Sequence, residues 1–450
     1  MNNGGASIVW FRQDLRLADQ PALAAAAAAG SVIPVYVLDD ESPGGRNRIG
    51  GAQRWWLHGS LERLAAALEA AGSRLILRRG RADTVLTALA TETGATGVHA
   101  LRHTEPWWRE AEGRLGDALT LHDGNTLAPL RQVVTGGGQP YRVYSAFWRA
   151  LQVQMPPPEP VAAPRLTAPS RWPASDALAS WKLRPTKPNW ATGFNMEPGE
   201  AEAARRLRDF ALRVDDYDID RNLPATEGTS RLSPHLHFGE ISPATVWHGV
   251  DGHAQSDKFR KELAWRDFTQ GVTLALPDYA ATNGSRKYDR LDWRSGPQAE
   301  ADLAAWQQGR TGYPIVDAGM RQLWATGWMH NRVRMITASF LVKHLLIDWR
   351  RGWEWFWDTL IDADYGNNSV NWQWVAGTGV DANMFSRIMA PLVQSEKFDA
   401  ADYIRLWVPE LGKVADSMIH DPGPVRGYPP KLIEHREGRE RALAAARGLA

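Results

Sequence analysis

The stretch SIVWFRQDLRLADQPALAAAAAAGSVIPVYVL, residues 7–38, decides the fold of the first part of the chain. It begins and ends with short runs rich in β-branched and aromatic residues, Ser7–Phe11 and Val32–Leu38, which are typical of buried strands. Residues 20–29, between these runs, are rich in Ala and Leu, which favour a helix. A strand, a helix and a second strand in this order predict a βαβ unit with parallel strands.

The same alternation continues to residue 131. Further apolar runs lie at 74–77, 97–101 and 119–122, and a long helical pattern covers 53–71. We therefore predict an α/β domain over residues 1–131, with helices covering a parallel sheet. Its loops contain neither Gly-x-Gly-x-x-Gly nor the P-loop pattern, so a bound dinucleotide is not expected to be held in the Rossmann manner.

The remaining chain changes character twice. Residues 132–200 contain Gly136–138, Pro156–158 and scattered prolines, which predict a connector with one helix at 145–153. From 201 to 450 the pattern is mostly helical, with helices expected at 299–308, 315–324, 336–349 and 353–360. The predicted fold class is α/β plus all-α: a Rossmann-like parallel-sheet domain, a long connector and a C-terminal helical domain over 201–450.

Composition narrows the function classes. The 450 residues include no Cys, which excludes disulfides, thiolate metal sites and cysteine nucleophiles. No leader or long apolar segment is visible, so we expect a cytoplasmic protein without a membrane span. The net charge of +1 means that nucleic-acid binding would need a local basic patch. There are 22 Trp residues, and 13 follow residue 240; packing explains most, and a planar cofactor, bases or electron transfer are the alternatives.

Two polar motifs open the helical half. The segment TSRLS, residues 229–233, comes before a helical pattern, where hydroxyl and backbone N–H groups suit a pyrophosphate. Ordinary helix capping is the alternative. In ELAWRDF, Glu262, Trp265 and Arg266 share one helix face, which indicates either a binding surface or a salt-bridged rim around one buried ring.

Two more polar motifs follow. In WMHNRVRM, Asn331, Arg334 and Met335 share a helix face, which suits the polar floor of a pocket or an exposed helical turn. Further on, Asp362, Asp364 and several Asn residues lie beside Trp372 and Trp374. Carboxylates and amides beside aromatic walls could hold a heterocycle by its edge. A metal ion is the rival ligand, but no His lies near in sequence, so no metal site is predicted.

With these four motifs in order, the chain closely resembles the DNA photolyase/cryptochrome family. VWFRQDLR at 9–16 and PYRVYSAFW at 140–148 are similar to the family's N-terminal and connector motifs. The segments 229–233, 262–268, 311–318, 328–335 and 371–379 are similar to its flavin domain, in the same order. The resemblance covers nearly the whole chain. It implies an antenna-type α/β domain and a helical domain that holds FAD in a bent conformation.

The resemblance also implies roles for individual residues. The residues expected to hold FAD are Tyr217, Thr229, Ser230, Arg231, Leu232, Ser233, Arg266, Arg334, Asp362, Asp364 and Asn368. Asn368 matches the amide that faces flavin N5 and favours the reduced flavin. Trp372, Trp349 and Trp293 match a chain that photoreduces FAD from the surface.

The choice of branch depends on two positions. The (6-4) photolyases resemble this chain but carry a second His where Asn331 stands. Glu262 matches the branch that repairs cyclobutane pyrimidine dimers, in which a carboxyl group bonds the base edge of the dimer. The expected function is therefore light-driven repair of cyclobutane dimers by a carbon–carbon lyase, with electron transfer from reduced FAD to a flipped-out dimer. A cryptochrome-like blue-light sensor and a (6-4) photolyase are the alternatives, although no regulatory tail is visible.

Partners follow from the same resemblance. The residues expected to bind UV-damaged DNA are Glu262, Trp265, Asn331, Arg332, Met335 and Trp374, with Arg332 as a phosphate clamp. A second, antenna chromophore is expected. Arg46 stands where deazaflavin-binding members also carry Arg, and Trp107 and Trp108 stand where folate-binding members carry polar residues. Methenyltetrahydrofolate, 8-hydroxy-deazaflavin and no antenna are therefore all alternatives. A monomer is expected.

Overall fold

The computed structural model describes residues 5–381 and 388–448. The chain divides into two compact units. The first comprises Met1–Pro188, Met196–Asp215 and Ser230–Pro277, and the second comprises Asn189–Asn195, Asp216–Thr229 and Asp278–Ala450. The first unit therefore includes parts of the chain beyond residue 200, and the domain boundaries drawn at 131 and 200 stay a prediction.

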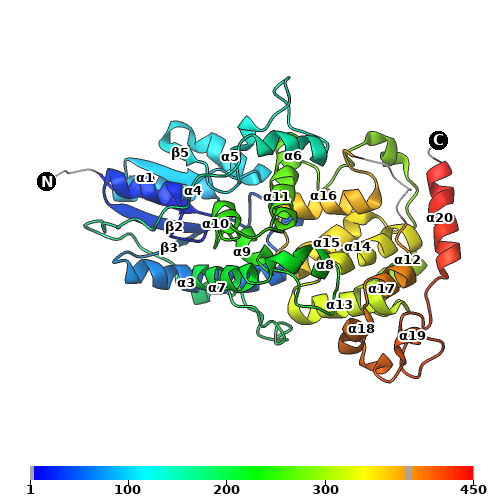
Figure 1. Ribbon diagram of the computed structural model, residues 1–450. Helices are drawn as coiled ribbons and strands as arrows, with labels where there is room; N and C mark the ends of the chain where they lie inside the picture. The colour runs from blue at the N-terminus through cyan, green and yellow to red at the C-terminus, as the bar shows by residue number, and fades with distance from the viewer. Residues whose placement is uncertain (1–4, 382–387, 449–450) are drawn as a thin grey trace. The chain divides into compact units, whose positions relative to one another are not determined.

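Within the described residues, the first unit contains one parallel sheet with the strand order β3-β2-β1-β4-β5 (Figure 1). The strands are β1 Ser7–Phe11, β2 Val32–Leu38, β3 Ile76–Arg79, β4 Gly97–Leu101 and β5 Leu119–His122. The bounds of all but β3 are those predicted. Strand β3 begins two residues later than predicted and ends on Arg78 and Arg79, which pair with Val37 and Leu38 of β2. Apolar pattern alone does not detect such a polar strand end.

Strands β1 and β2 are buried on both sides, because helices cover both faces of the sheet. On one face, Ile8 and Trp10 of β1 pack with Leu86 of α4 (Ala82–Thr93) and Ala111 of α5 (Pro106–Leu115). Helix α1 (Pro21–Ala29) packs against β1 and β4, and the right-handed crossover from β1 to β2 places it on the opposite face. The βαβ prediction is confirmed.

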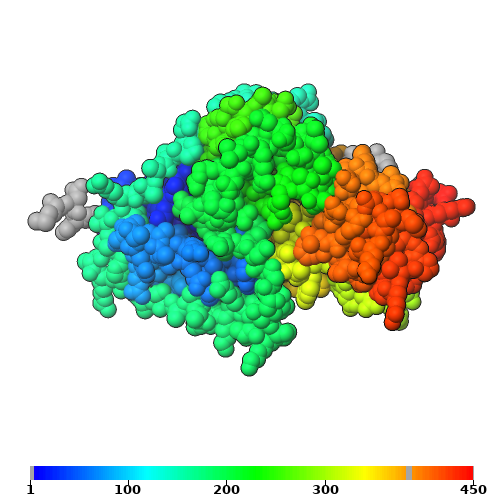
Figure 2. Space-filling model, turned by 60° about the horizontal axis from the view of Figure 1, so that its bottom comes forward, coloured from blue at the N-terminus to red at the C-terminus, as the bar shows by residue number. Residues whose placement is uncertain are grey.

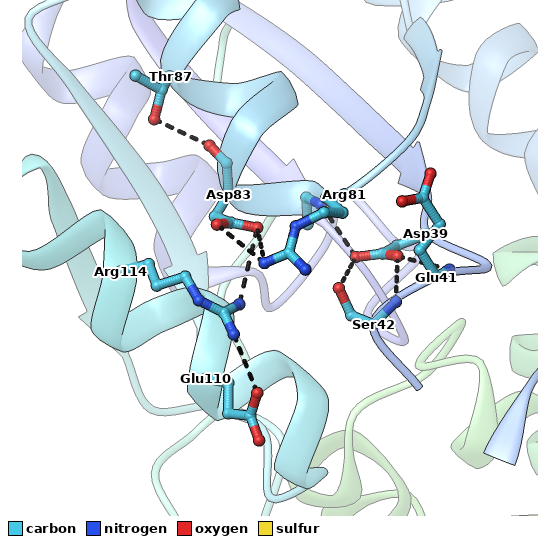
Figure 3. A network of polar contacts seen from close by, with 9 residues as sticks. Asp39, Glu41, Ser42, Arg81, Asp83, Thr87, Glu110 and Arg114 are labelled. Atoms are coloured by element: carbon cyan, nitrogen blue, oxygen red, sulfur yellow. Dashed lines mark hydrogen bonds and ion pairs between the residues drawn. The ribbon is translucent and has the colours of Figure 1, made fainter. Parts of the chain in front are cut away.

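A polar network fixes the loops at the end of β2 (Figure 3). Asp39, the first residue after β2, accepts hydrogen bonds from the backbone of Glu41 and Ser42 and from Ala82 N, at the start of α4. From α4, Asp83 approaches Arg114 of α5 at 3.8 Å. The network ties the loop after β2 to α4 and α5.

The first unit contains further helices, which lie in the sheet domain, in the connector or after it in the sequence. They are α2 Gly44–Asn47, α3 Gly51–Ala70, α6 Tyr144–Gln152, α7 Glu200–Ala211, α9 Ser233–His237, α10 Pro243–His248 and α11 Asp257–Ala275. Helix α6 confirms the single helix predicted in the connector, and α11 carries the ELAWRDF motif.

The described part of the second unit consists of helices and loops and contains no strand. Its helices are α8 Tyr217–Asp220, α12 Pro297–Gln307, α13 Pro314–Thr326, α14 Asn331–Ser339, α15 Trp349–Thr359, α16 Tyr365–Ala376, α17 Pro391–Lys397, α18 Ala401–Trp407, α19 Asp416–Ile419 and α20 His435–Arg447. Helices α17 and α18 pack on α13, and Figure 2 shows this later segment in orange beside the yellow part of the unit. None of the helices in the described ranges combines the length and apolar character that a membrane crossing requires.

The helix predicted at 336–349 is wrong in its second half. Helix α14 ends at Ser339, a π-helical turn covers Phe340–His344, and the helical path is broken at Leu346, whose φ is 52°. Trp349 then begins α15, with Asp348 as its N-cap. The break places Trp349 and Trp353 on a helix that packs against α16.

Candidate functional site

The predicted site residues fall into two sets, one in each unit. The set in the second unit is Tyr217, Thr229, Trp293, Asn331, Arg332, Arg334, Met335, Trp349, Asp362, Asp364, Asn368, Trp372 and Trp374. The set in the first unit is Ser230, Arg231, Leu232, Ser233, Glu262, Trp265 and Arg266. The structure brings together several members within each set.

In the second unit, Arg334 of α14 and Asp362 form a bidentate ion pair. The Nη1 and Nη2 atoms of Arg334 lie 3.0 and 2.8 Å from the two carboxylate oxygens. The Asp362 side chain is 1% exposed and that of Arg334 is 23% exposed. Arg334 Nε also donates to the carbonyl of Met329 at 2.8 Å. The pair holds the start of α14 beside the segment that leads into α16.

The start of α16 orders two more of the predicted residues. Asp364 is its N-cap, and its carboxylate accepts a hydrogen bond from Asn367 N at 2.6 Å, which satisfies a free N–H of the first turn. One turn later Asn368 is buried, at 8% exposure. Its Nδ2 donates to the carbonyl of Trp353 at 3.2 Å. The side-chain oxygen of Asn368 accepts no hydrogen bond from the residues in 5–381 and 388–448.

The first five residues of α14 include the predicted lesion residues Asn331, Arg332 and Met335. Asn331 is exposed, and the preceding His330 caps the helix by accepting from Arg332 N at 3.3 Å. The Arg332 guanidinium donates to Asn222, lies 3.8 Å from the Met335 sulfur and sits 4.6 Å from the centre of the Phe398 ring. Arg332 is thus held in a defined orientation by its own unit.

The three predicted electron-transfer tryptophans lie in different surroundings. Trp372 of α16 is buried and packs edge-on against Phe356, with ring centres 5.0 Å apart. A Cβ at Gly352 of α15 would lie 2.1 Å from the Trp372 ring, so glycine is required for this approach. Trp349 is fully buried, and its indole N–H donates to Asn283 Oδ1 at 3.0 Å. Trp293 is half-buried and packs on Leu291.

In the first unit, α11 presents Trp265 between two aromatic neighbours. Tyr144 of α6 stacks on Trp265 with ring centres 3.7 Å apart and an interplanar angle of 5°. Glu262 lies one turn earlier, and burial together with this carboxylate raises the pKa of Tyr144. Phe268 meets Trp265 edge-on at 5.5 Å. The carboxylate and the flat ring that the sequence placed on one face are therefore neighbours of a second flat ring.

Arg266 is not a solvent-exposed cation on the surface of α11. It is buried, and its Nη1 donates to the carbonyl of Asn125 at 2.6 Å. Asp267 accepts from Leu127 N at 2.7 Å, and burial raises the pKa of this carboxyl to about 7. Arg266 and Asp267 thus join α11 to the segment that follows β5. The contacts of Arg266 are those of a structural anchor, and its predicted role at FAD stays a prediction.

The segment 229–233 forms a tight turn before the short helix α9. Ser230 Oγ accepts from Leu232 N at 3.3 Å, and Arg231 has a φ of 50°. Leu232 is buried, whereas Ser233 is exposed and begins α9, which has five residues. The turn at 229–233 presents backbone N–H groups, as an anion site requires. Tyr217, in the second unit, is the buried first residue of α8.

Three residues with structural roles at these sites were not singled out from the sequence. Tyr144 covers one face of Trp265, Asn283 binds Trp349, and Asn222 binds Arg332. Tyr144 lies in the PYRVYSAFW motif, which was available as a signal. Asn283 and Asn222 lie in loops without a recognisable pattern, and only the tertiary structure brings them to their partners.

The residues of the second unit fit an edge-bound heterocycle such as a flavin. Asn368 provides a buried amide whose oxygen can accept a hydrogen bond, and the ion-paired Asp362 lies six residues before it. Two family models match the chain: "DNA photolyase" over residues 7–165 and "FAD binding domain of DNA photolyase" over residues 259–448. The chain belongs to the DNA photolyase/cryptochrome family.

Relatives of this photolyase/cryptochrome protein cover it almost completely. The Deoxyribodipyrimidine photo-lyase of Agrobacterium fabrum is 47% identical and aligns over 97% of both chains. Cryptochrome-1 of Arabidopsis thaliana is 34% identical over 93% of this chain and 65% of its own length. The family, the fold class, the enzyme class and the FAD-binding domain predicted from the sequence are confirmed.

Solved structures agree with this assignment. The crystal structure of a bacterial class III photolyase from Agrobacterium tumefaciens has a TM-score of 0.93 and 45% identity, and covers 100% of this chain and 98% of its own. The structure of an archaeal photolyase from Sulfolobus tokodaii, described with two FAD molecules and as implying a novel light-harvesting cofactor, has a TM-score of 0.86 and 30% identity. It covers 98% of this chain and 99% of its own.

Proposed function

We propose that this protein is a photolyase that repairs cyclobutane pyrimidine dimers in DNA, driven by light and dependent on reduced FAD. Repair of pyrimidine dimers is supported by full-length relatives named deoxyribodipyrimidine photo-lyase. The cyclobutane branch is supported by Glu262 and by Asn331, which replaces the second His of the (6-4) branch. Bound FAD supplies light-driven one-electron chemistry.

The observation that carries the proposal is the environment of Asn368. Its amide nitrogen is held by the Trp353 carbonyl at 3.2 Å, which leaves the amide oxygen oriented as an acceptor. Beside flavin N5, where the family resemblance would put it, such an acceptor would stabilise the proton that reduced flavin carries on N5. A photolyase needs this form before it can donate an electron to a lesion.

The other residues would bind, orient and exclude water. Arg334 would hold Asp362 in place at the flavin, Asp364 would keep α16 in register with it, and Tyr217 and residues 229–233 would bind the phosphates and the ribityl chain. Glu262, Trp265, Asn331, Met335 and Trp374 would receive the flipped dimer. Flipping costs a few kcal/mol, and less for a base pair that damage has already weakened.

The direct test is repair by protein that has been reduced chemically. The protein is reduced in the dark, mixed with an oligonucleotide that contains one thymine dimer, and illuminated. We expect restored thymines that accumulate with the light dose and none in the dark. Light-independent or absent repair by protein that retains its flavin would refute the proposal.

A cryptochrome-like light sensor is the second candidate, because cryptochromes are among the relatives. Such a protein would photoreduce its flavin through Trp372, Trp349 and Trp293 without restoring damaged DNA. The repair assay separates the two functions, since both predict photoreduction and only the photolyase predicts restored bases.

The antenna, the oligomeric state and the cytoplasmic location stay predictions. Trp107 is buried. The ring centre of Trp108 lies 4.9 Å from that of His103, and Trp108 packs on the core of the sheet domain. A second chromophore is expected on this domain. Chromatography and the absorption spectrum of material released from the purified protein would identify it as a folate, a deazaflavin or a second FAD.

A further inference from the structure

The indole of Trp349 is hydrogen-bonded to a neutral amide. Its Nε1 donates to Asn283 Oδ1 at 3.0 Å, while Asn283 Nδ2 donates to Asp289 Oδ1 at 2.7 Å. An indole N–H can only donate and a carboxylate can only accept, so both neighbours require this orientation of the amide. Trp349 is 0% exposed and Asn283 is 8% exposed.

The loop that carries Asn283 is anchored to the helix that carries Trp372. Gln373 of α16 donates to the carbonyls of Tyr279 and Thr282 at 2.6 and 2.9 Å, and it accepts from Gly284 N at 2.8 Å. A Cβ at Gly284 would lie 2.6 Å from Val380 N, so only glycine permits this close approach. Asn283 is therefore built into its position beside Trp349.

A second set of hydrogen bonds joins the segment of Trp293 to the turn that precedes Trp349. Arg294, the residue after Trp293, donates through its backbone to Leu346 O at 2.9 Å and through Nη1 to Leu345 O at 2.7 Å. Its Nη2 binds Asp302 at 2.8 Å. The turn at 345–346 lies shortly before Trp349 in the sequence. Asn283 therefore holds the Trp349 indole, and Arg294 holds the segment of Trp293 against this turn.

The charges around Trp349 are balanced. The Arg350 guanidinium lies 4.7 Å from the centre of the Trp349 ring, but it also forms two contacts of 3.1 Å with Asp348. Asp289 approaches Asn283 and not the indole nitrogen. The group in contact with the indole N–H is thus an amide oxygen, which accepts a hydrogen bond but is too weak a base to remove a proton.

This distinction matters once the indole is oxidised. Loss of one electron makes the N–H of an indole strongly acidic. A carboxylate in contact would take the proton and leave a neutral radical, which recovers its electron only if the proton returns. An amide leaves the proton on nitrogen, so the radical cation is restored by one electron alone.

We propose that Asn283 is a positioning residue that keeps Trp349 a relay in the photoreduction chain, by holding its indole through a hydrogen bond without accepting its proton. The inference rests on the proposed role of Trp349. The oxidant is the light-excited oxidised flavin: one electron leaves Trp349 for oxidised Trp372, one electron arrives from Trp293, and the Trp349 proton stays on Nε1. The radical ends on half-buried Trp293, where an external reductant restores it.

The test compares three substitutions. Asn283→Leu removes the hydrogen bond but adds no base. Asn283→Asp keeps an acceptor and adds a base, although the neighbouring Asp289 raises the pKa of the introduced carboxyl by repulsion. The double variant Asn283→Asp/Asp289→Asn removes that repulsion. The indole still donates to residue 283, and the hydrogen bond between residues 283 and 289 is reversed, with the amide of residue 289 as the donor. Asp289→Asn alone is the matched control.

Photoreduction yield and transient absorption are measured from pH 5 to pH 9. We expect Asn283→Asp to lower the yield several-fold at high pH, with a neutral tryptophan radical, and to recover at low pH, where the carboxyl is protonated. In the double variant the loss should begin at lower pH. Asn283→Leu should lower the yield less and show only the radical cation before Trp293 reacts.

A second measurement does not depend on photochemistry. In the dark, ¹⁵N-labelled protein should show a Trp349 Nε1–H resonance, assigned by its absence in Trp349→Phe. This resonance should shift upfield in Asn283→Leu, because its hydrogen bond is lost, and should stay downfield in Asn283→Asp. An unchanged resonance in Asn283→Leu would overturn the inferred contact.

Two photochemical results would overturn the inference. One is an equal loss in Asn283→Leu and Asn283→Asp at every pH, which would show that Asn283 only packs. The other is a wild-type yield in Asn283→Asp at high pH. If Trp349→Phe photoreduces normally, the relay itself is wrong, while repair by chemically reduced wild-type protein still tests the proposed function separately.

Discussion

Arg334 and Asp362 form a bidentate ion pair, with both carboxylate oxygens within 3.0 Å of guanidinium nitrogens and the Asp362 side chain 1% exposed. A buried carboxylate is costly without such a partner, because desolvation penalises its charge. The geometry indicates that the pair holds α14 and the start of α16 in fixed register, so the predicted lesion residues on α14 and the amide of Asn368 depend on the same contact.

Removing the cation should therefore destabilise the second unit. Arg334→Met leaves Asp362 buried without its partner, and we expect a loss of about 2 kcal/mol, below the usual cost for a fully buried pair because Arg334 is partly solvated. Thermal unfolding and flavin retention measure the effect. The matched control is Glu300→Gln, which breaks the exposed bidentate pair with Arg351 and should change neither. Equal effects of the two substitutions would contradict this view of the pair.

Asn368 should control how long the reduced flavin survives. In Asn368→Leu the acceptor is lost, and an unsatisfied flavin N–H in a buried site should cost about 1–3 kcal/mol. We expect faster reoxidation in air after reduction, followed by flavin absorbance. Asn371→Leu changes an exposed amide one turn further along α16 and serves as the control. Unchanged reoxidation in Asn368→Leu would place the flavin edge elsewhere.

Lys343 should make the stability of the protein depend on pH. Its amino nitrogen donates to the carbonyl of Ala376 at the end of α16 at 2.6 Å, and burial lowers the pKa of Lys343 to about 7. Between this value and the unfolded pKa, the unfolded chain binds a proton that the folded chain does not, so stability rises with pH by about 1.4 kcal/mol per unit. Below about pH 7 both the folded and the unfolded chain carry this proton, so the stability that Lys343 adds at higher pH is lost.

The measurement is the melting temperature between pH 7 and pH 9.5. Lys343→Met keeps an unbranched side chain that is one atom shorter, and it should remove the part of the slope that is due to this group. A slope that is identical in wild type and in Lys343→Met would show that another residue is responsible.

Local pattern predicted the strands well, because a parallel sheet buried on both faces selects continuous apolar runs. The two residues by which β3 was misplaced are arginines, whose strand conformation comes from pairing with β2. The helix expected at 336–349 failed for a different reason. That stretch contains no Gly or Pro, and its break is set by tertiary bonds from Arg294 to the carbonyls of Leu345 and Leu346. Asp348, a typical N-cap residue, was the one local signal.

Local pattern predicted less of the candidate site than of the sheet. No helix was predicted at 365–376, so the N-cap role of Asp364 and the burial of Asn368 one turn later come from the structure. The bond of Arg334 to Asp362 and that of Trp349 to Asn283 join residues 28 and 66 positions apart. Sequence spacing does not encode such pairs, and the roles of the residues came from the family resemblance.

Trp293 should be required for photoreduction and not for repair. Trp293→Phe keeps an aromatic ring on Leu291 but is much harder to oxidise than indole, so flavin photoreduction should be blocked. Repair by chemically reduced protein should persist, because that reaction draws no electron from the chain. The control is Trp324→Phe, which changes an exposed Trp of the same unit that stacks on Trp355. Full photoreduction in Trp293→Phe would make Trp293 a packing residue.

The last prediction concerns Glu262 and Asn331, which carry the choice of lesion. Glu262 lies one turn before Trp265 on α11, where the stacked Tyr144 fixes the ring. A lost hydrogen bond to the lesion would leave a polar group unpaired in a site that DNA makes dry, at a cost of about 1–3 kcal/mol. Glu262→Ala should therefore bind a thymine dimer more weakly and repair it with a lower yield per photon, with an unchanged flavin content.

Asn331→His tests the other half of the choice. Asn331 is the exposed first residue of α14, so a His there should be accommodated without loss of folding. It imitates the (6-4) pattern at one position, yet it should not confer (6-4) repair, because the neighbouring side chains are unaltered. Wild type and both variants are assayed on cyclobutane and (6-4) lesions under identical light. Repair of (6-4) lesions alone by the wild type would make the branch assignment wrong, whereas photoreduction without repair of either lesion would favour the light sensor.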